Sequence, residues 1–279
     1  MNRRMLNPGL RFSAVLCVTA LVFATLACSK FRSQPERKWH LVMEVEPTAS
    51  SSQSAAATQT VAIIERRLDL IGIRGAKVHV QEPASNGRIE ISLPALPDPE
   101  RIKKLLISTG NLEIAHVRSP PSPAPVTTYE TSETATGEMS KLSENFRVLR
   151  YVSDFEPTVA SEKDARWVIV ENPAIISGNH LRNATAIPSA RDSAAYNVSF
   201  SLQPEGAQRL SAWTRAHINE YLAVILNDEI KSIAFVKSEI SDTGEIIGRF
   251  TKQSAEDLAK VLSAGAFPAK VRFIEERID

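Results

Sequence analysis

The order of apolar periodicities in residues 39–117 constrains the fold more than any other feature of this sequence. Apolar and polar residues alternate in its strand-like stretches, whereas between Val61 and Ile71 apolar residues recur at the spacing of one helix face. The expected elements, in order, are a strand at 39–46, a helix ending before Gly72, strands at 77–81 and 88–93, a helix from Asp98 to Gly110, and a strand at 111–117.

This succession of strand, helix, strand, strand, helix and strand is the split pattern of ferredoxin-like folds. The helix ends support it, because Asp98 and Pro99 are typical of an N-cap and a first helical residue. Gly72 and Gly110 follow the last periodic residues, where helices commonly stop. We therefore expect an α+β protein whose first block is ferredoxin-like.

Residues 118–145 interrupt the pattern. They are rich in Pro, Ser and Thr and contain almost no aliphatic side chains. Such a segment buries too little apolar surface to order itself, so we expect a linker or a mobile excursion.

A second α+β block is expected from Phe146 to residue 268. Its expected elements are strands at 167–170, 196–202, 222–226, 232–236 and 245–250, a helix opening at Pro204, and a helix from Thr251 to Gly265. A last strand at 270–276 has no obvious partner in this block.

The first 27 residues have the features of a signal peptide. Residues 1–12 carry three arginines and no acid, and residues 13–27 contain no charge. That uncharged run is shorter than the about 20 residues of a membrane-spanning helix. It ends in Thr25-Leu26-Ala27-Cys28, which resembles the lipobox of bacterial lipoproteins, so we expect cleavage before an acylated (palmitate-bearing) Cys28 and a tether over 28–38. An ordinary signal peptide or a retained anchor helix are the alternatives.

The charge balance and the cysteine content exclude several classes of protein. The chain has 33 Lys plus Arg and 32 Asp plus Glu, and removal of residues 1–27 takes its net charge from +1 to −2, which argues against nucleic acid as a partner. The two cysteines are Cys17 and Cys28, so the body holds neither a disulfide framework nor a cysteine zinc site. A cysteine-free body suits an oxidising compartment outside the cytoplasmic membrane.

No catalytic motif for a nucleophile, a phosphate loop, a dinucleotide or a zinc hydrolase occurs in the sequence. Glu275 and Glu276 are adjacent on an expected strand and therefore point to opposite faces. The Glu65-Arg66-Arg67 run is interpreted as a solvated helix face. The five histidines occur singly, at His40, His79, His116, His180 and His217, and are not expected to bind a metal. We expect no enzyme activity, no catalytic residues and no cofactor.

Seven stretches resemble, in the same order, the periplasmic region of SecD, the protein-export subunit that works with SecF beside the SecY channel. In the first block they are Gln59 to Ile73, Arg88 to Arg101 and Asn111 to Ile114, similar to the family's Q-T and I-x-x-R, R-I-x-V-x-L-P-G with D-P-x-R, and L-E-F segments. In the second they are Ile176 to Leu181, Val198 to Ala207, Leu222 to Asn227 and Leu258 to Arg277. The last stretch is the most specific, because it resembles both L-R-A-G-A-L-P-A and V-E-E-R.

The resemblance implies a ferredoxin-like base, residues 39–117 plus 269–279, closed by the returning C-terminal strand. Residues 146–268 would then be an inserted head, with hinges at residues 118–145 and 265–268. It also implies that base and head bind translocated or unfolded polypeptide outside the membrane, with export-channel subunits as further partners.

The chain departs from the family at three places. SecD continues beyond E-E-R into a membrane bundle that, with SecF, couples proton flow to pulling, whereas this sequence stops at Asp279, so we expect no proton-driven motor of its own. The Gly after Leu-Pro is Ala95, and the L-D-G-K turn becomes Asn227 to Ile230, so contacts of that loop are not carried over. Residues 118–145 are not part of the resemblance.

The expected function is that of a lipoprotein in the bacterial cell envelope that faces the periplasm and assists export by binding polypeptide. Its anchor would lie in the outer or the inner membrane, and Ser29 after the cysteine favours the outer one. The alternative is a structural envelope lipoprotein that uses the same scaffold to hold a folded partner. An apolar groove between base and head would favour the first function, and a flat polar patch the second.

Overall fold

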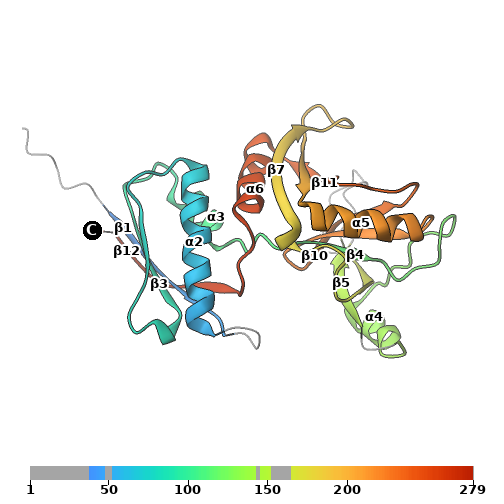
Figure 1. Ribbon diagram of the computed structural model, residues 1–279, viewed down its shortest axis with the longest axis horizontal. Coiled ribbons are helices and arrows are strands. Elements are labelled where there is room, and N and C mark those ends of the chain that lie inside the picture. Colours follow the sequence, from blue (N-terminus) through green and yellow to red (C-terminus); the bar gives the residue numbers. More distant parts are fainter. Residues whose placement is uncertain (1–37, 48–51, 143–144, 152–164, 279) are drawn as a thin grey trace, which may run out of the picture. The chain divides into compact units, whose positions relative to one another are not determined.

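The computed structural model describes residues 38–47, 52–142, 145–151 and 165–278 (Figure 1). Within these ranges the chain forms three β-sheets and five α-helices, which confirms the expected α+β class. None of those helices is both long enough and apolar enough to span a bilayer.

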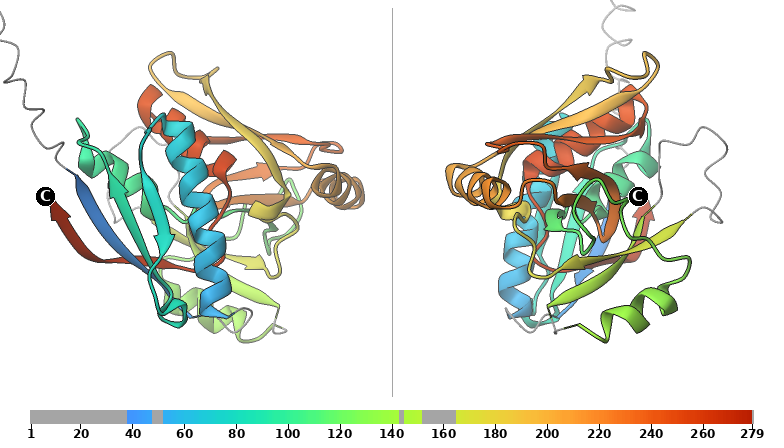
Figure 2. Two further views of the ribbon diagram at one scale, coloured as in Figure 1. Left: turned by 60° about the vertical axis from the view of Figure 1, so that its left-hand side comes forward. Right: turned by 90° about the vertical axis from the view of Figure 1, so that its right-hand side faces the viewer.

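The first sheet and its two helices form the base. Its elements are β1 (Trp39–Val45), α2 (Gln53–Ile71), β2 (Lys77–Val80), a 3-10 turn (Ala84–Asn86), β3 (Arg88–Leu93), α3 (Pro99–Ile107) and β12 (Val271–Ile278). The strand order is β12-β1-β3-β2, and all neighbours are antiparallel. Alternate residues of β1 are buried against Ile64 and Leu68 of α2, which lies along one face of the sheet (Figure 2). The base core therefore lies between this face and its helices.

The C-terminal strand closes the base sheet, as predicted. β12 pairs with β1 along its whole length, from Trp39 opposite Ile278 to Val45 opposite Val271. The order β12-β1-β3-β2 is the ferredoxin-like order, with β12 in the place of the fourth strand.

The strand expected at 111–117 does not join the base, and this part of the prediction is wrong. That strand, β4 (Leu112–His116), pairs with β9 (Tyr221–Leu226) in a five-stranded sheet. Leu112 and Ile114 lie in one apolar cluster, whereas Ala115 lies in another on the opposite face. A strand buried on both faces needs cover on both sides, which the base, with helices on one face, does not provide.

The second block contains the other two sheets. Its further elements are β5 (Phe146–Tyr151), β6 (Arg166–Glu171), a 3-10 turn (Gly178–His180), β7 (Leu181–Pro188), β8 (Tyr196–Leu202), α5 (Pro204–Ala216), β10 (Glu229–Phe235), β11 (Thr243–Phe250) and α6 (Lys252–Ala264). The strand orders are β4-β9-β10-β5-β6 and β11-β8-β7. Strands β5 and β7 and the 3-10 turn are absent from the sequence prediction, and the other elements of this block lie within a few residues of it.

The segment expected to be a linker is ordered over residues 118–142, so that expectation is wrong. It contains α4 (Ser132–Met139), which is capped by the Thr131 hydroxyl. Ala135 of α4 is fully buried, and backbone hydrogen bonds hold the rest of the segment to the second block. Tyr129 and Trp167 exchange two such bonds of 2.9 and 2.8 Å, and the Arg118 amide donates to the Ile169 carbonyl at 2.9 Å. The edge strand β6 thus supplies hydrogen-bond partners for the backbone of this segment, which its composition does not reveal.

Candidate functional site

The chain leaves the base at residues 108–111 and returns to it at 264–270, and one buried arginine holds both crossings. Arg67 of α2 donates through Nη1 to the carbonyls of Leu105, Leu106 and Ser108, at the end of α3. Its Nη2 donates to the Thr109 carbonyl at 3.4 Å and to the Gly265 carbonyl at 3.2 Å, just after α6. The guanidinium therefore ties the outgoing and the returning segment to the same helix.

The Arg67 side chain has no exposed surface and lies over the ring of Phe267, with 4.0 Å between Cζ and the ring centroid. Burial lowers the pKa of Arg67 to about 9, so the group remains protonated at neutral pH. The carbonyl oxygens and the Phe267 ring replace the hydration that the cation loses. The prediction that Arg67 lies on a solvated helix face is wrong. Its spacing of three from Ile64 and four from Ile71 puts it on the apolar stripe, and that was the available signal.

Gly110 is required at the outgoing crossing. Its φ is +66°, and a Cβ there would approach Val261 Cγ1 to 2.9 Å and Arg67 Nη2 to 3.2 Å. Both the left-handed backbone and the close approach therefore exclude a side chain at this position.

Helix α6 belongs to both parts of the fold. Ala255, Ala259 and Leu262 lie in the apolar cluster of the second block, whereas Val261 lies in the base core. In Figure 1, α6 follows β11 in the chain, and it packs against both α2 and β7. Any movement of the second block relative to the base must therefore break the contacts of α6 either with α2 or with β7.

Two polar contacts fasten α6 to the base. Arg101 of α3 donates to both carboxylate oxygens of Asp257, at 2.8 and 2.7 Å, and Arg66 donates to the Ala264 carbonyl at 3.0 Å. Partial burial of Asp257 raises its pKa, but the hydrogen bonds and charge of Arg101 outweigh burial and hold the pKa below its usual range. The predicted hinge at 265–268 does lie at a crossing, but the one at 118–145 does not, because β4 already belongs to the second block.

The β9–β10 turn touches the outgoing crossing, a contact that the sequence did not indicate. Asn227 and Asp228 have φ values of 51° and 63°, as in two-residue hairpin turns. The Asn227 side-chain oxygen accepts hydrogen bonds from the Thr109 hydroxyl and, at 3.1 Å, from the Asn111 amide. The replacement of the family's turn residues thus leaves a turn that contacts the crossing.

A groove of about 450 Å³ opens beside the two crossings. Its lining comes from four separate segments: Gln59, Ala62 and Ile63 of α2, Asn111, Ser177 to Asn179, and Ala266 to Pro268. All of these residues are uncharged, and they combine side-chain amides with apolar groups. Amides offer both a donor and an acceptor to a peptide backbone, so the groove suits an extended chain without demanding a particular sequence.

The histidines lie away from this groove, except that His180 follows its lining turn. His116 contacts Glu171 at 3.0 Å and Glu220 at 2.8 Å, and its ring centroid is 6.0 Å from that of His217, which stacks on Trp213. His180 Nδ1 accepts from the Ser177 amide, and His40 and His79 lie near Glu90. Among the described residues, no group of three or more His, Cys, Asp or Glu side chains is arranged to hold a metal ion. Cys28 lies outside the described residues.

Comparisons with known proteins agree with the seven sequence stretches. The family models described as "SecDF, P1 head subdomain" and "Protein translocase subunit SecDF, P1 domain, N-terminal" match residues 155–269 and 57–119. Protein translocase subunit SecD of Koribacter versatilis is 34% identical over 248 residues, covering 88% of this chain and 43% of that protein. The Aquifex aeolicus SecD is 30% identical over 220 residues, covering 79% and 39%. The chain thus spans less than half the length of these relatives.

Solved structures share the fold. The crystal structure of SecDF in its super-membrane-facing form matches 94% of this chain and 34% of its own, with a TM-score of 0.63 at 20% identity. A second structure, described as that of a membrane component SecDF that enhances protein export, matches 85% of this chain and 99% of its own, with a TM-score of 0.60 at 21% identity. The chain therefore carries a P1 region of the SecD family, with an N-terminal base and a head.

Proposed function

We propose that this protein binds extended, unfolded polypeptide on the periplasmic side of the membrane, in support of protein export. The uncharged groove beside the base–head crossings carries this proposal. The proposal assigns binding rather than catalysis, and the expected partners are translocating chains and subunits of the export channel.

The chemistry of the groove supports an extended chain as its ligand. Gln59 and Asn179 are exposed amides on facing elements, α2 and the 3-10 turn, and Ile63 and Phe267 supply apolar surface between them. Amides bond to the backbone that every polypeptide shares, and small apolar walls accept many side chains. Affinity is then weak and tolerant of sequence, because a short segment buries little area and must be ordered on binding.

Titration with a permanently unfolded, reduced protein and with its folded form tests the proposal. The wild-type chain is expected to bind the unfolded form only. Gln59→Arg, which replaces an amide that donates and accepts by a longer side chain that only donates, is expected to weaken binding about tenfold, because the backbone N–H groups of the ligand lose an acceptor and the groove is narrowed. Gln208→Arg, the same change on an exposed position of α5 outside the groove, is the matched control and should bind as wild type. Equal binding of folded and unfolded protein, or equal binding by both variants, would contradict the proposal.

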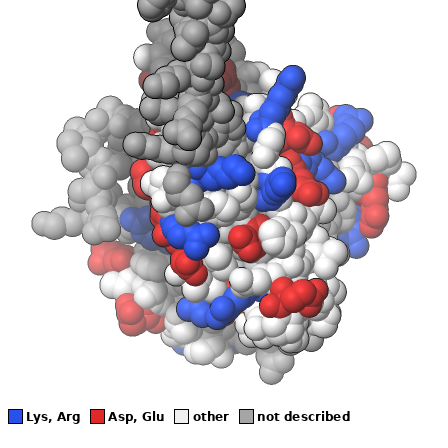
Figure 3. Space-filling view, turned by 90° about the vertical axis from the view of Figure 1, so that its left-hand side faces the viewer, with Lys and Arg blue, Asp and Glu red and all other residues white. Residues whose placement is uncertain are grey.

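A folded partner is the second candidate, and the open face of the base sheet favours it. There Glu44 pairs with Arg88 at 3.6 Å and Arg272 at 3.0 Å, and Glu90 lies near His40 and His79. Figure 3 shows cationic and anionic side chains interspersed on the base side of the molecule. Such a mixed polar surface suits a folded protein of complementary charge. Co-purification of one stoichiometric folded protein, insensitive to Gln59→Arg, would support this function instead.

We further propose that Cys28 is the lipid-bearing N-terminus of the mature protein, which would anchor it in the envelope facing the periplasm. The support is the short uncharged run and Thr25-Leu26-Ala27-Cys28. Mass spectrometry of the N-terminal peptide from membranes is expected to give an acylated Cys28 with residues 1–27 removed. Cys28→Ser should abolish the acyl mass and release the protein from membranes, and Cys17→Ser should change neither. An unmodified Cys28 within an intact precursor would contradict the assignment.

A further inference from the structure

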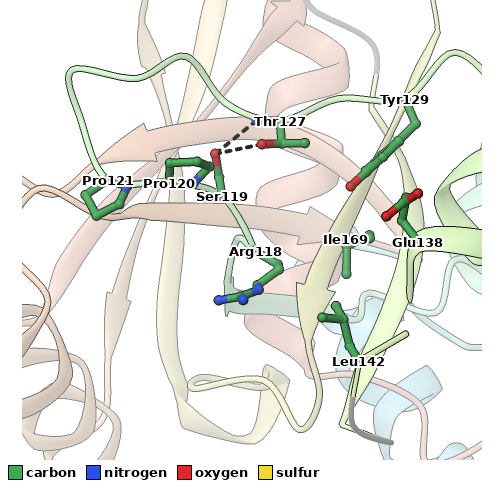
Figure 4. Close-up of a pocket in the computed structure, with 9 residues that line it drawn as sticks. All are labelled: Arg118, Ser119, Pro120, Pro121, Thr127, Tyr129, Glu138, Leu142 and Ile169. Atoms are coloured by element: carbon green, nitrogen blue, oxygen red, sulfur yellow. Dashed lines mark hydrogen bonds between the residues drawn. The ribbon is translucent and has the colours of Figure 1, made fainter. Parts of the chain in front are cut away.

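A pocket of about 350 Å³ lies at the edge of β6, where residues 119–128 arch away from the sheet. At one end of this arch the Arg118 amide bonds to Ile169, and at the other Tyr129 pairs with Trp167. The lining residues are Arg118, Ser119, Pro120, Pro121, Thr127, Tyr129, Glu138, Leu142 and Ile169 (Figure 4). Six of these nine residues, from Pro120 to Leu142, lie between the stretches that the two family models match, whereas Arg118, Ser119 and Ile169 lie within them.

The frame of the pocket is fixed by its own hydrogen bonds. Ser119 Oγ accepts from the Thr127 amide at 3.0 Å and lies 3.4 Å from the Thr127 hydroxyl, so the two ends of the loop are tied together. The Tyr221 hydroxyl donates to the Ala124 carbonyl at 2.7 Å and holds the tip of the loop. Four prolines within residues 119–128 further restrict the backbone. A site with a frame fixed in this way spends little free energy on ordering when it binds.

The charged side chains of the pocket lie on opposite sides of it. Figure 4 shows Arg118 on one side, Tyr129 and Glu138 on the other, and Ile169 and Leu142 between them. The Glu138 carboxylate pairs with Lys141 at 2.7 Å, so its charge is balanced from outside the pocket. The Arg118 guanidinium has no carboxylate partner among the described residues, so the pocket keeps one uncompensated cation. A carboxylate satisfies both the charge and the fork geometry of such a group.

We propose that this pocket binds the carboxyl-terminal end of a polypeptide, with the terminal carboxylate on Arg118 and an apolar last side chain against Ile169, Leu142 and the prolines. The inference rests on the proposed function, which brings polypeptide chains to this surface. It adds a second contact with a different role: the groove binds any part of a chain, whereas the pocket selects its end. Since the C-terminus of an exported chain emerges last, the site would bind only chains whose translocation is complete.

Binding of two fluorescent peptides of one unstructured sequence ending in leucine, one with a free carboxylate and one with a C-terminal amide, tests this on the full chain. Wild type is expected to bind the free acid about tenfold more tightly than the amide, as one charge-assisted pair predicts. Arg118→Gln should bind both equally, and Arg118→Lys should retain part of the preference, because it keeps the charge without the fork. Arg74→Gln, at an exposed arginine of the base, is the matched control and should keep the full preference.

Several outcomes would overturn the proposal. Equal binding of acid and amide by wild type, or a preference that survives in Arg118→Gln, excludes the carboxylate contact. Arg118-dependent binding of vesicles containing anionic lipid, without discrimination between the peptides, would assign the pocket to a membrane surface instead. Failure of the proposed function gives a different result. Wild type and Gln59→Arg would then bind the unfolded protein equally, while wild type would still prefer the free acid to the amide and Arg118→Gln would not.

Discussion

Arg67→Met is expected to lower the free energy of unfolding by about 3–5 kcal/mol, because several carbonyls lose their donor and each buried acceptor left unpaired costs about 1–3 kcal/mol. Methionine fills much of the same volume but donates no hydrogen bond. The carbonyls of Leu105, Leu106 and Ser108, together with those of Thr109 and Gly265, would lose a donor that sits in the protein interior. Because these carbonyls lie on both crossings, the effect should reach the attachment of the second block as well as the base. Urea denaturation followed by circular dichroism measures the change.

Two further variants separate the hydrogen-bonding role of Arg67 from its charge. Arg67→Lys keeps the cation but presents one ammonium in place of the planar fork, so it should fall between wild type and Arg67→Met. Arg74→Gln removes a charge from an exposed turn of the base and should leave the midpoint unchanged. If Arg67→Met unfolds at the wild-type urea concentration, the crossings are held by other contacts and this account of Arg67 is wrong.

The base was predictable from sequence because each of its elements carries its own local signal. Strand β1 alternates strictly, α3 begins at an Asp-Pro N-cap, and α2 ends at Gly72 in the left-handed conformation. Strand partners carry no such signal. The stretch at 112–116 is an apolar strand by pattern, and only the structure shows that it pairs with β9 and is buried on both faces. Local periodicity therefore predicts the helices and strands of the base, but it does not predict that the chain leaves the base before β4.

The groove and the pocket could not be predicted from the sequence, for a different reason. The groove is assembled from α2, Asn111, the turn at 177–179 and residues 266–268, which no spacing rule connects. Most of the pocket lies in a segment whose composition predicts disorder, and hydrogen bonds to the edge of β6 help to order that segment. Both sites depend on long-range backbone pairing. The resemblance to SecD led us to expect a polypeptide ligand, but it does not indicate which residues would contact one.

Removal of residues 270–279 is expected to abolish the cooperative thermal unfolding of the base. The deletion takes away β12, and with it the pairing along the whole of β1 and the packing of Val271 and Phe273 on the base core. It also removes Glu276, which accepts from the Trp39 indole at 2.9 Å and pairs with Lys103. These losses are comparable with the whole stability of a domain, about 5–15 kcal/mol. Calorimetry or circular dichroism against temperature measures the transition.

Ile278→Ser and Phe273→Ala distinguish the contribution of β12 as a strand from the contributions of its individual side chains to stability. Ile278 is 67% exposed, so Ile278→Ser should melt as wild type, whereas Phe273→Ala should lower the melting temperature and keep one cooperative transition. The truncated chain differs from both because it leaves β1 as an unpaired edge beside an opened core, which also favours association between chains. A truncated protein that melts cooperatively at the wild-type temperature would show that β1, β3 and β2 form a stable sheet without their C-terminal neighbour.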